Sequence, residues 1–155
     1  MATALFYPVY LAIVFSFTLI FIPKKEYKEY LIYGLINGGL TDMIAVGIFA
    51  NLLHFMWFKN GGIFFTMGQI YLSPPCWTFS IMLFLYFLPA QRPFLYLYIL
   101  NFTMYSFGYG LMVHNCGLYD FKSWFYYSIA PFIFLAWYSF SAWIFRKTSP
   151  LAKKL

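Results

Sequence analysis

Charged side chains are scarce in this chain of 155 residues, where Asp, Glu, Lys and Arg together make up only 9%. Soluble domains carry about 25% charged residues. The hydrophobic fraction is 63% and the aromatic fraction is 26%, which is more apolar surface than a soluble fold of this size can bury. We therefore expect an all-α fold, a polytopic bundle of transmembrane helices in the cell membrane.

Cysteines and catalytic motifs are also scarce. Two cysteines are too few for a disulfide framework. The sequence contains no P-loop, nucleophile elbow, paired carboxylates or HExxH motif, and its acids other than Asp42 lie in connections between apolar runs. The basic residues are dispersed in short gaps, which does not predict a nucleic-acid surface. We expect no independent enzymatic activity.

Long hydrophobic stretches dominate what is present. A helix needs roughly 20 apolar residues to cross the hydrocarbon core of a bilayer. The segment 59–75 is too interrupted for a span and too apolar for a free loop, so we interpret it as interfacial or re-entrant. The sequence predicts one integral membrane domain, 1–155, with five spans at about 4–22, 30–58, 75–88, 94–116 and 121–145.

The distribution of Lys and Arg predicts an orientation for these five spans. Lys59 and Lys122 fall on one side of the membrane, and the other eight cations fall on the opposite side. Because cytoplasmic loops carry the excess of Lys and Arg, the N-terminus is expected outside and the C-terminus in the cytoplasm. The eight cations on the predicted cytoplasmic side are Lys24, Lys25, Lys28, Arg92, Arg146, Lys147, Lys153 and Lys154.

The two histidines and two cysteines all fall near the predicted outer ends of spans. His54, His114, Cys76 and Cys116 could complete a tetrahedral metal site, and the two histidines could hold a haem iron. The cysteines could instead form a disulfide, since the outside is oxidising. The alternative is that these are ordinary boundary residues, because an amphipathic histidine is stable at the interface and a free thiol behaves as a small hydrophobe.

Asp42 lies near the middle of the second predicted span. A carboxylate at the bilayer centre is costly, and such residues usually mark a function. At 100° per residue, Asn37, Asn51 and His54 share one helical stripe, whereas Asp42 lies on another. Gly38 and Gly39 in the same segment are interpreted as a site of close helix packing. Asn37, Asp42 and Asn51 are thus candidate intramembrane polar residues.

The stretches "LIYGLINGGLTD" and "SPPCWTFSIMLFLYFLP" resemble a family of small membrane proteins of spore-forming Gram-positive bacteria. The resemblance implies a bacterial helical membrane protein and assigns no catalytic residue or cofactor. Our first hypothesis is an accessory or structural subunit that packs against lipid and against another membrane protein or a second copy. The alternatives are a haem- or metal-binding redox protein using His54 and His114, and a transport or channel component using Asp42.

Overall fold

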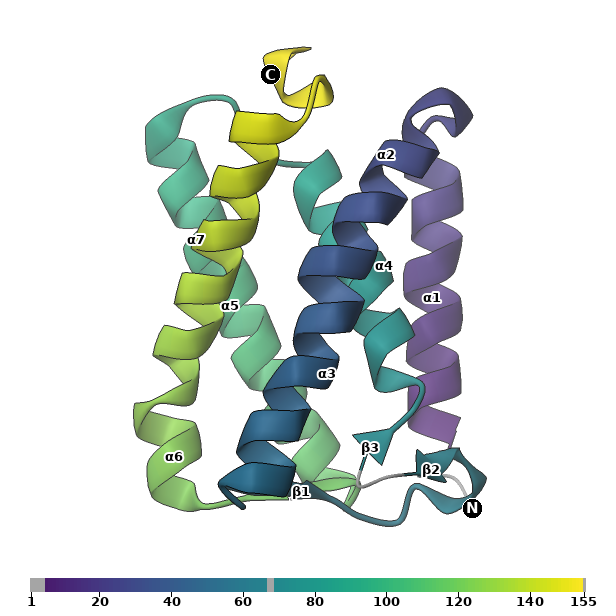
Figure 1. Cartoon of the computed structure of the whole chain (residues 1–155), viewed down its shortest axis with the longest axis vertical. Helices are drawn as coiled ribbons and strands as arrows, with labels where there is room; N and C mark the ends of the chain where they lie inside the picture. Colours follow the sequence, from purple (N-terminus) through teal and green to yellow (C-terminus); the bar gives the residue numbers. More distant parts are fainter. Residues whose placement is uncertain (1–4, 67–68, 155) are drawn as a thin grey trace.

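The computed structural model describes residues 5–66 and 69–154, which fold into a bundle of helices along the long axis of the molecule (Figure 1). The six-residue π-helical segments η2 (Leu35–Leu40) and η3 (Gly47–Leu52) belong to one continuous helix, Lys24–Leu52, hereafter the long helix. The mostly helical structure confirms the predicted all-α class. The α-helices are α1 (Phe6–Phe21), α2 (Lys24–Gly34), α3 (Thr41–Val46), α4 (Ser73–Tyr86), α5 (Arg92–Asn115), α6 (Ser123–Ser128) and α7 (Ala130–Thr148), and the 3₁₀ turns are η4 (Gly62–Phe64) and η5 (Leu151–Lys154).

The predicted segments 4–22, 75–88 and 94–116 coincide with α1, α4 and α5 to within about two residues at each end. The boundaries of segment 30–58 are wrong at both ends. Its helix begins at Lys24, directly after Pro23, because Lys and Glu are good helix formers. It ends at Leu52, and His54 then adopts a left-handed backbone conformation with φ 51°.

Length and composition distinguish the long helix from the other helices. Within the part of the chain that the structure describes, only the long helix is long and apolar enough to cross a membrane by length and composition. α1 and α4 have only 16 and 14 residues. α5 and α7 are longer, but Tyr and Ser in both helices, and Trp in α7, lower their mean hydropathy. By this criterion, only the second of the five predicted spans is supported.

Short strands close one end of the bundle. β1 (Met56–Phe58) pairs antiparallel with β4 (Tyr119–Phe121), with Trp57 opposite Asp120. The segment predicted to be interfacial or re-entrant contains η4 and the two-residue strands β2 (Phe65–Thr66) and β3 (Gln69–Ile70), which pair with each other. Figure 1 places both pairs at the end of the bundle where α1 begins. Strands β1 and β4 thus connect the end of the long helix to the start of α6.

Helix α4 is the centre of the packing. Ile81, Met82, Phe84 and Leu85 are fully buried, between α1 and the long helix on one side and α7 on the other. Glycines of the long helix permit the closest approach: a methyl group built on Gly38 would lie 2.5 Å from the Trp77 carbonyl oxygen. The structure therefore confirms close helix packing at this glycine pair.

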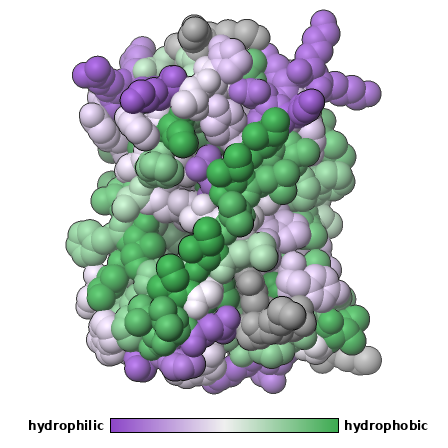
Figure 2. Space-filling view, in the orientation of Figure 1, coloured by the Kyte–Doolittle hydropathy of each residue, from purple (hydrophilic) through white to green (hydrophobic). Residues whose placement is uncertain are grey.

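Hydropathy divides the face seen in Figure 2 into three zones. Figure 2 shows hydrophilic residues gathered at both ends of the molecule, with a largely hydrophobic zone between them. At the end that contains the C-terminus, an Arg146 guanidinium nitrogen donates to the carbonyl oxygens of Pro89 and Ala90, and Ser149 donates to Glu29 at 3.0 Å. These contacts join α2, the α4–α5 turn and the end of α7 at one end of the molecule, where most of the cations lie.

Candidate functional site

The predicted soft ligands do not form one cluster. His54 is exposed in the turn after the long helix, whereas Cys76 is buried near the start of α4, where its thiol lies 3.8 Å from the Tyr7 carbonyl oxygen. Cys116 follows α5, and both cysteines are free thiols, so the disulfide alternative is wrong. Across residues 5–66 and 69–154, no three or more His, Cys, Asp or Glu side chains are grouped as metal ligands. The predicted four-ligand metal site is therefore not assembled.

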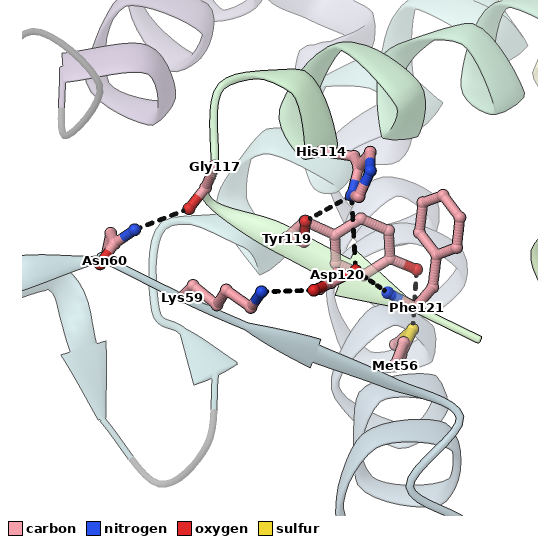
Figure 3. A network of polar contacts seen from close by, with 8 residues as sticks. All are labelled: Met56, Lys59, Asn60, His114, Gly117, Tyr119, Asp120 and Phe121. Atoms are coloured by element: carbon pink, nitrogen blue, oxygen red, sulfur yellow. Dashed lines mark hydrogen bonds and ion pairs between the residues drawn. The ribbon is translucent and has the colours of Figure 1, made fainter. Parts of the chain in front are cut away.

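His114 is held in a local polar network (Figure 3). Its Nδ1 lies 3.0 Å from the Tyr119 carbonyl oxygen and 3.6 Å from Asp120 Oδ1, and its ring packs on Phe121 at a centroid distance of 4.6 Å. The contact with the Tyr119 carbonyl oxygen holds the imidazole in a fixed orientation at the α5–β4 turn. This arrangement agrees with the alternative that His114 is an ordinary boundary residue.

Lys59 and Asp120 form an ion pair across the β1–β4 end of the molecule (Figure 3). The hydrogen bond from Lys59 holds the pKa of the Asp120 carboxyl below its usual value, and the Phe121 backbone N–H donates to the same carboxyl at 2.9 Å. Asn60 adds a hydrogen bond of 3.0 Å to the Gly117 carbonyl oxygen. These contacts join the two connections at this end of the bundle.

The three candidate intramembrane polar residues lie in different environments. Asn37 is buried, and its backbone carbonyl accepts a hydrogen bond of 2.6 Å from the Trp137 indole nitrogen. Asn51 is exposed, so the predicted common stripe of Asn37 and Asn51 is wrong. The cause is the π-helical geometry of η2 and η3, since each i→i+5 turn rotates the faces away from the 100° periodicity of an α-helix. Asp42 is half-buried on α3.

Asp42 lines a cavity of about 370 Å³ between the long helix, α4, α5 and α7. Half of the residues in its wall are aromatic, which is about twice the aromatic fraction of the whole chain. Asp42 is the only charged residue among the described residues in this wall. The aromatic residues of the wall are Tyr7, Phe49, Phe58, Trp77, Tyr109, Tyr119, Phe125, Tyr126, Phe134, Trp137 and Phe140.

Hydroxyl groups at the cavity differ in their bonding. Tyr126 donates to the Phe107 carbonyl oxygen at 2.6 Å, and Tyr119 donates to the Met56 sulfur at 3.1 Å. The Tyr109 hydroxyl oxygen is buried and has no hydrogen-bond partner among the described residues. Burial raises the pKa of Tyr119, and the nearby Tyr126 and Asp42 raise it further, so Asp42 acts electrostatically on this wall.

The sequence identified Asp42 but not the aromatic residues around it. Trp77, Tyr109, Tyr126 and Trp137 come from α4, α5, α6 and α7, and no local spacing relates them. Gly110 is the one signal that was available, because a methyl group there would collide with the Tyr126 hydroxyl. A glycine within an apolar helix such as α5 marks a close approach of this kind.

Comparison with known proteins leaves the chain without an assigned family. No protein-family model, curated protein or solved structure matches it.

Proposed function

We propose that the chain is an integral membrane protein with five crossings that serves as an accessory or structural subunit of a membrane assembly. In this proposal its N-terminus lies outside the cell and its C-terminus in the cytoplasm. The observation that carries the proposal is the apolar zone between two hydrophilic ends (Figure 2). The resemblance to small membrane proteins of spore-forming bacteria agrees with it and remains a prediction.

Large apolar side chains exposed on the outer helices support membrane embedding. Examples are Ile20 on α1, Ile44 on the long helix, Tyr96 on α5 and Phe132 on α7, with exposed fractions of 69%, 54%, 67% and 70%. Soluble monomers rarely expose contiguous apolar patches above about 600 Å². Lipid chains or the helices of a partner would cover this surface.

The lengths of α5 and α7 are compatible with membrane crossing, whereas α4 is short. With a rise of about 1.5 Å per residue, α5 is about 36 Å long and α7 about 28 Å, close to the hydrocarbon thickness of about 30 Å. α4 is only about 21 Å long. Because protein surrounds α4, its irregular ends need not reach the lipid surface themselves.

The charge distribution supports the orientation. Lys24, Lys25 and Lys28 lie at the end where Arg146 contacts the α4–α5 turn. Lys59 and Lys122 lie at the opposite end, beside β1 and β4. An excess of cations at one end matches a cytoplasmic face in contact with anionic lipid. The β2–β3 segment at the other end fits the interfacial alternative.

Thiol labelling in intact cells tests the proposed topology. In a Cys116→Ser background, Lys122→Cys is expected to react with a membrane-impermeant maleimide, because Lys122 lies at the proposed outer end. Lys28→Cys is expected to react only after the cells are made permeable. Similar labelling of both positions in intact cells would contradict the orientation, and recovery of the protein from the soluble fraction would contradict membrane embedding.

Purification of the tagged full-length protein in a mild detergent tests the accessory role. We expect a stoichiometric membrane-protein partner, or a defined homo-oligomer, because the outer helices offer wide apolar contact surfaces. Cross-linking in the native membrane before extraction controls for dissociation by detergent. A solitary monomer under both conditions would contradict this role.

A second candidate function is transport of a small solute that uses Asp42. The specific observation in its favour is the interhelical cavity beside this carboxylate, since intramembrane acids commonly face such cavities. Solute uptake by vesicles containing wild-type or Asp42→Asn protein tests it. The metal alternative gains no such support, because the described residues contain no group of three or more His, Cys, Asp or Glu side chains that could hold a metal ion.

A further inference from the structure

We propose that the cavity beside Asp42 binds one hydrocarbon chain with its adjoining carbonyl group, which enters sideways from the outer leaflet of the membrane. The inference rests on the proposed membrane embedding and orientation, and not on the accessory role or on transport. Three observations carry it: the cavity is open along one side, its length and wall suit a single chain, and one buried hydroxyl in its wall lacks a hydrogen-bond partner among the described residues.

The cavity opens between the long helix and α7, which both lie on the near side of the molecule in Figure 1. Its deep wall consists of buried residues on α4, α5 and α6, such as Trp77, Ser106 and Phe125. Its rims are less buried, with Ala45 half-buried on the long helix and Phe140 52% exposed on α7. A molecule dissolved in the bilayer can therefore reach the cavity sideways, without crossing either end of the bundle.

Two contacts between its sides mark the ends of the opening. The Trp137 indole nitrogen donates to the Asn37 carbonyl oxygen at 2.6 Å, and Phe49 packs on Phe125 with ring centroids 5.2 Å apart. The stretch of the long helix from Asn37 to Phe49 is roughly 15–18 Å long. One leaflet of a bilayer contributes about 15 Å of hydrocarbon, so the opening matches a single chain of the outer leaflet.

The volume and the wall of the cavity suit such a chain. The cavity volume of about 370 Å³ has room for about twelve methylene-sized groups, if each takes about the 30 Å³ of a water molecule. Because lipid tails are as apolar as the wall, the chain gains packing contacts there rather than hydrophobic free energy, and selectivity depends on a polar contact. The bound group is uncharged and requires no counter-charge, so the Asp42 carboxylate keeps the interactions that it makes within the protein.

Tyr109 supplies the polar contact. It lines the cavity from α5, where its ring packs against Trp77 with centroids 5.6 Å apart, and its buried hydroxyl oxygen has no hydrogen-bond partner among the described residues. The hydroxyls of Tyr119 and Tyr126 are bonded within the protein. A carbonyl oxygen of the ligand would accept the hydrogen bond that Tyr109 lacks, and a buried donor left unpaired is costly.

The depth of Tyr109 agrees with a carbonyl group of the outer leaflet. Tyr109 lies six residues before the end of α5, about 9 Å from the proposed outer end of this helix. The ester groups of lipids lie at the boundary of the hydrocarbon region, close to this depth. A chain bonded to Tyr109 by its carbonyl would then extend along the opening toward Trp137, near the middle of the membrane.

Fluorescence quenching of the full-length protein in lipid nanodiscs tests the inference. Trp57, Trp124 and Trp143 are exposed and are replaced by phenylalanine, which leaves Trp77 and Trp137 in the cavity wall as reporters. The probes are a chain-brominated fatty acid methyl ester and the matching alkyl methyl ether, which differ only in the carbonyl group. Because bromine quenches tryptophan on contact, we expect half-maximal quenching at about fivefold lower mole fraction of the ester than of the ether. Equal values, or no quenching of the folded protein by either probe, would overturn the proposal.

Two pairs of variants locate the carbonyl contact and the chain. Tyr109→Phe removes only the unpaired hydroxyl and is expected to abolish the preference for the ester. Tyr98→Phe makes the same change on α5 outside the cavity wall and should keep that preference. Ala45→Phe places a ring in the cavity and should weaken quenching by both probes, whereas Ile44→Phe places one at an exposed neighbouring position and should not. An unchanged preference in Tyr109→Phe, or unchanged quenching in Ala45→Phe, would refute the site.

A variant in which Trp143 is the only tryptophan separates this inference from the proposed membrane embedding. Trp143 is 56% exposed on α7, so both probes should quench it equally where α7 faces lipid. An unquenched Trp143 would contradict the embedding and with it the cavity site. A quenched Trp143 without a preference for the ester at the cavity would contradict only the present inference.

A comparison of two bilayers identifies the source of the carbonyl group. Weaker binding of the ester probe in nanodiscs of ester-linked than of ether-linked phosphatidylglycerol would identify a bilayer lipid as the natural occupant, because only the ester-linked lipid competes for Tyr109. Equal binding in the two bilayers would identify a free fatty ester. Both results support a carbonyl site, provided that the preference for the ester over the ether depends on the Tyr109 hydroxyl.

Discussion

Replacing Gly38 by leucine is expected to lower the free energy of unfolding by about 3 kcal/mol or more. A Cβ at this position would lie 2.5 Å and 2.8 Å from the carbonyl oxygen and carbon of Trp77, and 2.9 Å from the Thr78 Cα. These are backbone atoms at the centre of the bundle, so they cannot move aside as a flexible side chain can. The long helix would have to separate from α4, and detergent-based unfolding followed by circular dichroism measures the loss.

Gly47→Leu is the matched control for this prediction, because it makes the same change in the same helix. A Cβ on Gly47 would have no neighbouring heavy atom within 4 Å. We expect its stability to stay within about 0.5 kcal/mol of the wild type. An equal loss in both variants would mean that leucine disturbs the helix itself, and the packing explanation for Gly38 would then be wrong.

Replacing Tyr138 by alanine is expected to cost about 4 kcal/mol. The side chain is completely buried on α7, where its ring centroid lies 4.7 Å from that of Phe84 and 5.3 Å from that of Trp137. Truncation would leave a cavity at the contact between α4 and α7. Its hydroxyl is also 2.7 Å from the Ser106 hydroxyl, so the buried Ser106 would lose its partner.

Two variants divide this loss into its parts under the same unfolding conditions. Tyr138→Phe removes only the hydroxyl and should cost about 1 kcal/mol. Phe132→Ala removes a ring that is 70% exposed on the same helix and should cost less than about 1 kcal/mol. A similar cost for Phe132→Ala and Tyr138→Ala would show that α7 does not pack on α4 as described.

Local hydrophobicity predicted α1, α4 and α5 to within about two residues, whereas the predicted segment 121–145 begins in β4 and is divided between α6 and α7. Pro23 and Pro89 lie beside the ends of α1 and α4, and these ends agree with the predicted segments. Gly38 was correctly associated with helix packing, since a residue without a side chain in an apolar helix indicates close approach. The prediction succeeded wherever the deciding interactions lie within one or two helical turns.

Long-range features were not predictable in the same way. Met56–Phe58 has the composition of a helix end, and only its pairing with residues more than 60 positions away makes it a strand. The π-helical geometry of η2 and η3 has no signal in the local sequence pattern, so the 100° periodicity that was assumed between Asn37 and Asn51 does not apply. The cavity wall combines residues from α4 to α7 with Asp42, and no single stretch of sequence contains that pattern.

The central position of α4 implies an order of assembly. α1, the long helix and α4 lie within the first 86 residues, so all residues of the interfaces that α4 makes with α1 and the long helix precede α5 and α7 in the chain. Asp42 belongs to this early half, whereas Tyr126 and Trp137 belong to the late half. The cavity therefore exists only when the late half has docked on α4. A chain that ended before α7 would lack Phe134, Trp137 and Phe140, and with them one side of the cavity wall.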